Sequence, residues 1–572
     1  MRNSENPLGV RVTTYYPWDK PPSACHTIEM PDEKVSAILD NAFQNWCYVQ
    51  PVMIAAPTGS GKTSLVIQIA RYCHRVSPDK WVMLLVNRTA IAVQQMQHFA
   101  SELGSKWAKI TDPDVFELFE VLDDVRVIIA TYQGFSAHRD RFPLNKVAWV
   151  IFDEAHVFHA DSLFNPYLDQ LFWNLPKLFS RANRLYLSAT PDSVIHDICD
   201  AEGQNLSACA ACPYPFCQSK GKLLLYKFPA HFQSLSLRYY REASELVKLV
   251  QQHPKDQFLL FTAKRESLNF IQESSYMKQF RDANISCGYL DSDRKGTPLW
   301  KQVCRDGTFE EQVLIATSVL DCGVNLVSPR LCHIIVETTD QMEFLQMIGR
   351  RRLAAHENLT VYIRAYNRRA VQNRLNSVEN QIGFIHRASK TIQKSGNGTV
   401  LYKGWMDEDS TRPYLHLLNC SGTGKILPKR TAQHYLIWQQ VHLKRLLECF
   451  DLHGDDSALP RAAHIWLNQG DSYSPARWLD YDSKFTARKD LLSMVDANKD
   501  NPLNKVEYQA LAKELLSRIN DIQTFAHDTN ESINRTPTTM NKRFERLQIP
   551  YKFHQEGRGK GAVYTLVRTK EA

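Results

Sequence analysis

The stretch AAPTGSGKTS, from Ala55 to Ser64, decides the fold of the first part of the chain. It follows the apolar run PVMI and precedes SLVIQIARYC, whose apolar residues recur at helical spacing. Strand, glycine-rich loop and helix in this order let backbone N–H groups close around phosphates at a helix N-terminus. Lys62 then reaches the phosphates and the Thr63 hydroxyl binds Mg²⁺. The alternative is a glycine turn without a ligand. The predicted nucleotide-binding residues are Thr58, Gly59, Ser60, Gly61, Lys62, Thr63 and Ser64.

A pair of acids supplies the second half of the predicted site. The run VAWVIFDEAHVF ends a buried strand in Asp153 and Glu154, at the carboxyl edge of the sheet. We expect Asp153 to hold Mg²⁺ through water and Glu154 to orient and deprotonate an attacking water. His156 is expected to couple this site to a neighbouring domain. The alternative for adjacent acids at a strand end is a helix N-cap.

Length and composition bound the class of protein. The 572 residues suggest three or four domains, and their net charge of +8 weakly favours a polyanionic partner. There is no apolar run long enough to span a membrane and no secretion-signal pattern at the N-terminus. Thirteen cysteines in a chain of this length indicate a reducing cytosol rather than a disulfide framework. We therefore expect a cytoplasmic or nucleoid-associated protein.

Apolar runs alternate with helical periodicity in the first two-thirds of the chain, as in parallel α/β domains. One series of strands ends at RLYLSAT, and a second runs from KLLLYKF to LTVYIRAY. Beyond about residue 395 the pattern becomes helical. The second glycine-lysine run, CSGTGKI, has Ile426 where a Mg²⁺-binding hydroxyl is needed and is interpreted as a loop. The predicted segments are an N-terminal segment 1–33, α/β domains 34–218 and 219–395, a helical region 396–499 and a tail 500–572.

At this point the chain resembles the superfamily 2 helicases and translocases with a DEAH-type second motif, over about residues 34–395. The phosphate loop looks like motif I, LLVNRTAIAVQQ like motif Ia, Asp153–His156 like motif II and Ser188–Thr190 like motif III. FLLFTAKRES resembles motif IV and IATSVLDCGVNL motif V. The resemblance implies two tandem RecA-like domains, ATP with Mg²⁺ as cofactors and nucleic acid as partner. Implied nucleic-acid contacts are Arg88, Thr131 and Gln133, the last two from IIATYQGF. The nearby aromatic residues Tyr132 and Phe135 could stack on bases, although core packing is the alternative.

The run QMIGRRRL, residues 346–353, stands in the place of motif VI. The resemblance implies that Gln346 and Arg350 face the γ-phosphate, where an arginine stabilises the charge of hydrolysis. The family pattern carries a further arginine where this chain has Leu353, so Arg352 is the candidate substitute. On a helix a shift of one residue turns a side chain by about 100°, so Arg352 would not point in the same direction as the family's second arginine. Arg351 is expected to face solvent or a carboxylate.

Motif V has Asn325 where many relatives carry aspartate. By resemblance, Thr317 faces the nucleic-acid backbone, while Asp321 and Gly323 line the ATP cleft. The combination with QMIGRxR resembles the branch that includes viral and plasmid origin-binding helicases.

Four cysteines lie in or beside a turn-rich segment at 196–220, which is predicted to be an insertion. Four thiolates suit Zn²⁺ or an iron–sulfur cluster, but the second half of the segment lacks a further Cys-x2-Cys pair. Inert cysteines are the alternative. The candidate ligands are Cys199, Cys209, Cys212 and Cys217, with His196 as a possible replacement.

The tail is predicted to contain two helices and a β-hairpin, the order typical of a winged helix. Between Arg535 and Lys570 there are nine lysines and arginines against two acids, which suits phosphate contacts. Lys542, Arg543 and Arg546 are the candidate contacts. A protein-binding or purely structural winged helix is the alternative.

The sequence predicts an ATP-dependent helicase or translocase, with DNA preferred over RNA. Two alternatives stay open. One is an ATP-driven sensor or remodeller that unwinds nothing, and the other is a site-specific origin binder whose motor melts the DNA at that site.

Overall fold

The computed structural model describes residues 21–104, 108–110, 127–165, 167–211, 221–229, 235–262, 276–294, 296–317, 320, 324–351, 357–395, 412–420, 426–522, 535–547, 549–557 and 559–569. The chain forms two compact units. Unit 1 comprises Met1–Leu237 and Val250–Ser472, and unit 2 comprises Arg238–Leu249 and Tyr473–Ala572.

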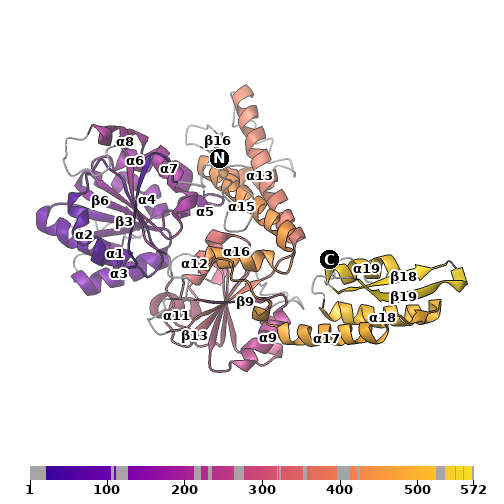
Figure 1. Cartoon of the computed structure of the whole chain (residues 1–572). Helices are drawn as coiled ribbons and strands as arrows, with labels where there is room; N and C mark the ends of the chain where they lie inside the picture. The colour runs from indigo at the N-terminus through magenta and orange to yellow at the C-terminus, as the bar shows by residue number, and fades with distance from the viewer. Residues whose placement is uncertain are drawn as a thin grey trace. The chain divides into compact units, whose positions relative to one another are not determined.

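The first domain of unit 1 is an eight-stranded parallel sheet (Figure 1). Its strands lie in the order β1, β8, β2, β7, β6, β3, β5, β4. Because β2, β7 and β6 are neighbours, the segments that follow them meet at one edge of the sheet. The strands are β1 Cys25–Glu29, β2 Val52–Ala55, β3 Trp81–Val86, β4 Ala108–Ile110, β5 Val127–Thr131, β6 Val147–Phe152, β7 Asn183–Ser188 and β8 Leu223–Lys227.

Both faces of this sheet are covered by helices, since alternate residues of each strand point to opposite sides. In β2, Val52 and Ile54 pack with α1, α2 and α3, whereas Met53 and Ala55 pack in the core of the other face. The helices on the two faces explain why the strands are apolar throughout. They are α1 Val35–Ile38, α2 Lys62–Val76 and α3 Thr89–Leu103 on one face, and α4 Tyr132–Ala137, α5 Val157–Ala160, α6 Leu168–Leu178, α7 Ile195–Ala201 and α8 Gly203–Ala210 on the other.

Two strands depart from the sequence prediction. β8, the run KLLLYKF, joins the first sheet by pairing with β2 and β1, whereas its place in the chain predicts the second series. β1 lies within the predicted N-terminal segment 1–33 and forms the edge of the same sheet. A buried apolar strand has the same sequence character in either sheet, so the order along the chain is a poor guide to its neighbours.

The segment predicted to be a turn-rich insertion is helical over its described part, as α7 and α8. The residue between the two helices, Glu202, is fully buried and accepts hydrogen bonds from Arg184 Nε (2.8 Å), Tyr186 Oη (2.7 Å) and Asn205 Nδ2 (2.7 Å). This buried network ties α7 and α8 to β7. Up to Ala211 the segment is therefore helical rather than turn-rich.

A second domain, which belongs to unit 1 except for most of β9 and α9, is built on a six-stranded sheet in the order β11, β12, β10, β13, β14, β9. The first five strands run parallel. The strands are β9 Ser236–Tyr240, β10 Gln257–Phe261, β11 Cys287–Leu290, β12 Val313–Ala316, β13 Leu331–Val336 and β14 Thr360–Arg364. The helices are α9 Ala243–Gln252, α10 Tyr276–Asp282, α11 Pro298–Asp306 and α12 Gln341–Ile348.

Two long helices, α13 (Arg368–Ser395) and α15 (Arg430–His453), pack against each other after the second sheet, and α16 (Ala458–Trp466) follows. α15 and α16 lie in the predicted helical region 396–499, whereas α13 precedes it. The short strands β15 (Leu418–Cys420) and β16 (Ile426–Pro428) pair antiparallel. The run CSGTGKI, predicted to be a loop, begins at the last residue of β15 and ends at the first residue of β16. Its residues 421–425 are outside the described part of the chain.

Unit 2 contains the predicted helices and hairpin of the tail. α18 (Lys505–Ile522) and α19 (Pro537–Arg546) precede the hairpin of β18 (Tyr551–Glu556) and β19 (Val563–Arg568), and β17 (Pro502–Leu503) adds a third strand. Leu491 and Val495 of α17 (Tyr481–Ala497) belong to the same apolar core. The folded tail therefore begins before residue 500.

Candidate active site

The phosphate loop has the predicted form. β2 ends at Ala55, and α2 begins at Lys62 after Gly61, whose φ of 94° lies in the left-handed region. Gly59 has a φ of 78°. Residues with a side chain rarely adopt this backbone conformation, so glycine is favoured at both positions of the loop. Lys62 is buried, and its Nζ donates to the carbonyl oxygens of Ala56 (2.7 Å) and Pro57 (3.0 Å). The Lys62 side chain therefore spans the phosphate loop and contacts its first residues.

Asp153 and Glu154 follow β6 directly, next to the end of β7, and β2 is one strand further along the sheet. The backbone N–H of Asp153 donates to the Leu85 carbonyl (2.9 Å), which fixes the turn. Glu154 has a φ of 51°, although it is not a glycine. A strained backbone of this kind costs about 1–3 kcal/mol and occurs mainly where function requires it.

The two acids differ in their electrostatic surroundings. Burial and the adjacent Glu154 raise the pKa of the Asp153 carboxyl well above its ordinary value, against the effect of Lys62. Burial acts in the same direction on Glu154, but His156, Lys62 and Arg350 together hold its pKa below the ordinary value. A divalent cation beside Asp153 would favour its ionised form. Thr63 and Asp153 offer the oxygen ligands that Mg²⁺ prefers, so these residues fit a magnesium nucleotide.

His156 connects motif II to motif III within the first domain. Its Nδ1 lies 3.1 Å from Ser188 Oγ and 3.4 Å from Glu154 Oε2. The Ser188 hydroxyl also accepts from the backbone N–H of Thr190 (3.0 Å). Burial lowers the pKa of His156 to about 4, so the ring is neutral near pH 7. These contacts lie in one domain, whereas the predicted coupling was to its neighbour.

Motif VI does not continue as a helix. α12 ends at Ile348, and Gly349 lies so close to the phosphate loop that a Cβ there would be 2.6 Å from Thr58 Oγ1. Arg350 is buried, and its Nε donates to the Gln346 carbonyl (2.9 Å). The rotation of about 100° per residue expected for a helix therefore does not apply to Arg350 and Arg351. Gly349 has an ordinary φ of −70°, so the missing side chain matters here for the close approach to Thr58.

The other residues of motif VI have separate surroundings. Arg351 is buried, donating to the Leu331 carbonyl (3.2 Å) and pairing with Glu357 (2.6 Å). The expected carboxylate partner is present, but the alternative of solvent is wrong. Gln346 is also buried, and its Nε2 has no hydrogen-bond partner. Arg352 lies outside the described residues, as do Asp321 and Gly323 of motif V.

One cavity of about 520 Å³ collects the predicted residues from both domains of unit 1. Arg350 and Asn325 of the second domain line it together with the phosphate loop and the acid pair. Of the predicted residues, Ser60 and Gln346 are buried but do not line the cavity. The predicted residues that line it are Thr58, Gly59, Gly61, Lys62, Thr63, Ser64, Asp153, Glu154 and Arg350.

Some lining residues were not predicted. Lys34 Nζ donates to the Gly59 carbonyl (2.9 Å), and Gln95 Nε2 donates to Thr63 Oγ1 (3.3 Å). Ser36 and His98 also line the cavity. Lys34 precedes the loop by 25 residues without a motif, so the sequence carries no sign of it. Gln95 is the last residue of the motif Ia stretch, and the helical spacing of that stretch is the one signal that could have indicated it.

The nucleic-acid contacts predicted in the two sheet domains lie at or just after the ends of strands β3, β5 and β12. Arg88 pairs with Asp161 through two contacts of 2.5 and 3.1 Å. Thr131 caps α4 by accepting from the Gly134 N–H (2.9 Å), and Gln133 is exposed. Thr317 is partly exposed. The nearby aromatic residues Tyr132 and Phe135 are core residues.

The described cysteines give no support to the four-thiolate metal site. Cys199 is buried in the core of one sheet face, while Cys209 packs with Cys47 in a separate cluster. Burial raises the pKa of Cys199 far above its ordinary value, which suits an inert thiol. Cys212 and Cys217 lie outside the described residues. The described part fits inert cysteines.

Two family models match the chain in tandem. The type III restriction enzyme res subunit model matches residues 32–193, and the helicase conserved C-terminal domain model matches residues 241–352. The chain is a superfamily 2 helicase. The two matches lie within the two parallel-sheet domains, which are its tandem RecA-like domains, and the enzyme hydrolyses ATP. In the described residues no helix is long and apolar enough to cross a membrane.

Several solved structures are similar to this helicase. S. cerevisiae Dbp5 bound to RNA and ADP BeF3 is 16% identical, covering 55% of this chain and 79% of that chain with a TM-score of 0.41. Mss116p bound to single-stranded RNA and AMP-PNP is 13% identical, covering 60% and 78% with a TM-score of 0.44. A DEAD box protein from Methanococcus jannaschii is 16% identical, covering 55% and 82% with a TM-score of 0.32. No curated protein sequence matches this helicase.

Proposed function

We propose that this helicase couples ATP hydrolysis between its two RecA-like domains to movement along DNA. The observation that carries the proposal is the single cavity to which the phosphate loop, the acid pair and Arg350 all contribute. Since residues of both domains line this cavity, its nucleotide content can govern how the domains close. Repeated closing and opening would move a strand across the domains.

Each residue of the cavity has a proposed part in hydrolysis. Mg²⁺, when bound with ATP, supplies positive charge to the phosphate oxygens. Lys62 binds the same phosphates, and Glu154 accepts a proton from the attacking water. Arg350 stabilises the charge on the γ-phosphate from the second domain. Gln346 Nε2, buried without a partner, is proposed to donate to the γ-phosphate or its water after closure.

The strand is proposed to contact Arg88, Thr131, Gln133 and Thr317. Arg88 is already held in a bidentate pair by Asp161, so a DNA phosphate would share or replace that carboxylate. Gln133 is exposed and available for the backbone. These residues follow strands of both domains, which supports a path across the two sheets.

DNA is proposed over RNA on two grounds. Gln346 occupies a position where relatives that act on RNA often carry histidine. The helix, helix and hairpin of unit 2 are compatible with a winged helix, in which α19 would face DNA. Lys542 of α19 is exposed and suits a phosphate contact, whereas Arg543 is buried and does not. The side chain of Arg546 lies outside the described part of the structure.

The proposed place of action is the cytoplasm or nucleoid, in an origin-binding or related replication process. ATPase turnover measured with single-stranded DNA, duplex DNA and RNA tests the substrate, and strand displacement under the same conditions tests the motor. We expect the largest stimulation with DNA, accompanied by displacement. Stimulation by RNA alone would overturn the DNA proposal. Stimulation without displacement would instead identify a remodeller. Selection of one sequence by the tail from a random DNA pool would identify an origin binder.

A further inference from the structure

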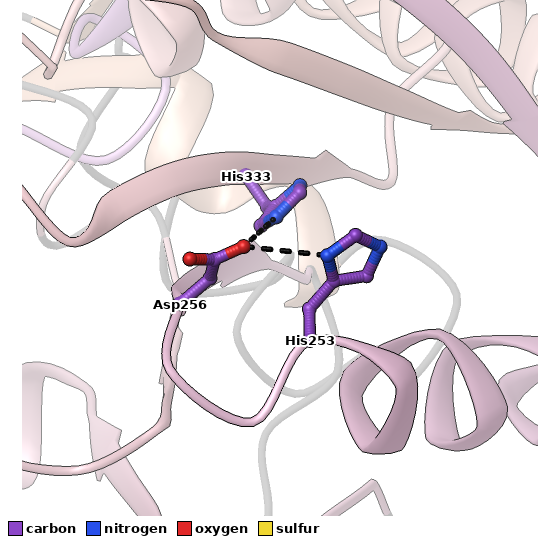
Figure 2. Close-up of side chains that lie close together, drawn as sticks. All are labelled: His253, Asp256 and His333. Carbon is purple, nitrogen blue, oxygen red and sulfur yellow. Dashed lines mark hydrogen bonds and ion pairs between the residues drawn. The ribbon is translucent and has the colours of Figure 1, made fainter.

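A group of potential metal ligands lies outside the ATP cavity, in the second RecA-like domain. His253 follows α9, Asp256 precedes β10, and His333 lies in β13 (Figure 2). Among the described residues this is the one group of three such side chains whose donor atoms all lie within 4.8 Å of one another. Figure 2 shows both imidazole rings directed at the same carboxylate.

The distances within this group suit a shared metal ion better than strong hydrogen bonds. His253 Nδ1 and His333 Nε2 lie 3.3 Å and 3.2 Å from the same oxygen, Asp256 Oδ2. Hydrogen bonds between charged groups of this kind are usually about 2.7–2.9 Å long. A tetrahedral zinc ion, with bonds of about 2.0–2.2 Å, holds neighbouring ligand atoms about 3.3 Å apart. Both nitrogen–oxygen distances thus already match the spacing of zinc ligands, and the two nitrogen atoms lie within 4.8 Å of each other.

The surroundings fix the orientation of the ligands. Tyr362 Oη lies 3.1 Å from His333 Nδ1, which leaves Nε2 to face Asp256. The ring of Phe258 stacks on His333 with centroids 4.2 Å apart. The backbone N–H of Asp256 donates to the His253 carbonyl (3.2 Å), closing a turn that carries two of the ligands. A second partner on a ligating histidine is a usual feature of metal sites.

We propose that His253, Asp256 and His333 bind one divalent transition-metal ion, zinc by preference. Two imidazoles and one carboxylate are ligands that zinc accepts, and a fourth position is left to water. His333 is nearly buried, whereas the side chains of His253 and Asp256 are 42% and 34% exposed. An ion can therefore enter from solvent. Once bound, it would clip the turn before β10 to β13, two residues from Leu331, whose carbonyl accepts from Arg351.

The test uses the full chain without a histidine tag and without chelators. Metal analysis of the purified wild-type protein should find one zinc per chain. His253→Ala and Asp256→Asn should each bind zinc at least about tenfold more weakly and lose it during purification. His386→Ala, which changes an exposed histidine of α13, is the matched control and should keep the zinc. Tyr362→Phe should weaken zinc binding by about 10–100-fold while leaving the three ligands in place. Circular dichroism checks that each variant is folded.

Cobalt serves as a spectroscopic probe of the same site. Co²⁺ added to the metal-free chain should give the visible absorption of a tetrahedral complex without sulfur charge-transfer bands, and His253→Ala should remove it. Zinc should also raise the thermal unfolding midpoint of the wild type and His386→Ala but not of His253→Ala. Wild-type protein that binds neither ion would overturn the proposal. Equal zinc in wild type and His253→Ala would also overturn it, since the ion would then lie elsewhere.

Discussion

At the scale of single residues, Glu154 and Lys62 divide the work of the ATP cavity. Glu154→Gln should still bind ATP but hydrolyse it very slowly, because an amide cannot accept the proton of the attacking water. Lys62→Ala should lose both functions, since it removes the main side-chain charge on the phosphates. Nucleotide binding and ATPase rate, measured on the same preparations, separate the two effects. Wild-type turnover by Glu154→Gln would contradict its assigned role.

The arginines of motif VI should differ in kind rather than degree. Arg350 lines the cavity, so Arg350→Ala should lower the ATPase rate by about 10³–10⁵, because it removes the charge proposed to stabilise the γ-phosphate. Arg351 instead donates to the Leu331 carbonyl and pairs with the part-exposed Glu357, so Arg351→Ala should cost about 1–3 kcal/mol of stability with a smaller effect on turnover in the folded fraction. ATPase assays and thermal unfolding of both variants check this. Equal effects of the two on turnover would mean that both act at the nucleotide or neither does.

Gly349 offers a further test of how motif VI approaches the phosphate loop. A Cβ at this position would lie 2.6 Å from Thr58 Oγ1 and 3.2 Å from the Leu345 carbonyl. Gly349→Ala should therefore push Arg350 from the loop and lower the ATPase rate by at least about tenfold, the equivalent of 1.4 kcal/mol. Gly383→Ala in α13 is the matched control, because its Cβ would meet only the flexible end of Arg387. The control should leave turnover unchanged and stabilise α13 by about 0.5–1 kcal/mol.

At the scale of elements, α15 connects to both RecA-like domains within unit 1. Asp169 of α6 accepts hydrogen bonds from Thr431 N (2.8 Å) and Thr431 Oγ1 (2.9 Å) at the start of α15, and from Asn419 Nδ2 (2.7 Å). Further along α15, Gln439 Nε2 lies 3.4 Å from Asp340, which caps α12 of the second domain. Because α15 contacts both domains, a movement of one domain can be transmitted through it to the other.

Asp169→Ala should detach the start of α15 from the first domain. It leaves three buried donors without their acceptor, which should cost about 3 kcal/mol or more. Faster amide hydrogen exchange in the first turn of α15 would measure the loss. Asp200→Ala is the matched control, since Asp200 pairs with the neighbouring Arg430 in an exposed bridge that contributes about 0–1 kcal/mol. Equal exchange in both variants would show that Asp169 does not hold the helix.

The elements also show where sequence patterns stop being informative. The strand–loop–helix of motif I and the acid pair after β6 were predictable, because glycine positions and strand ends are local features. The end of α12 at Gly349 was not, since residue spacing alone continues a helix. The placement of β8 was not either, because pairing between parallel strands leaves no local trace in the sequence. His253 and His333 were missed because they meet only through the packing of β10 and β13.

At the scale of the whole molecule, the sequence predicted the elements of the tail but not its limits. The apolar core of unit 2 includes Leu491 and Val495, which lie before the predicted boundary at residue 500. Trp478 packs on Tyr239, and Arg241 pairs with Asp480, so residues far apart in sequence complete unit 2. Arg543, predicted to face phosphate, is buried instead. A charge count cannot distinguish a buried arginine from an exposed one.

These limits define the last prediction, which concerns the tail as a DNA-binding module. Deleting residues 481–572 keeps Trp478 and Asp480 with their partners and removes α17 together with the core that it shares. The ATP cavity should remain, because its described lining residues all precede Arg351. DNA binding should weaken and its salt dependence flatten, since each lost phosphate contact removes about 0.9 from the log–log slope.

A gentler version changes only exposed charges of α19 and the hairpin. Lys542→Gln, Lys552→Gln and Arg568→Gln together should weaken DNA binding and reduce the salt slope by up to about 2.7, if all three contact phosphate. Lys505→Gln, Lys513→Gln and Arg518→Gln on exposed positions of α18 remove the same charge and serve as the control. Titration of labelled DNA at several salt concentrations measures both. An equal loss in the two triple variants would indicate a non-specific effect of net charge, and no loss in either would leave the RecA-like pair alone to hold the strand.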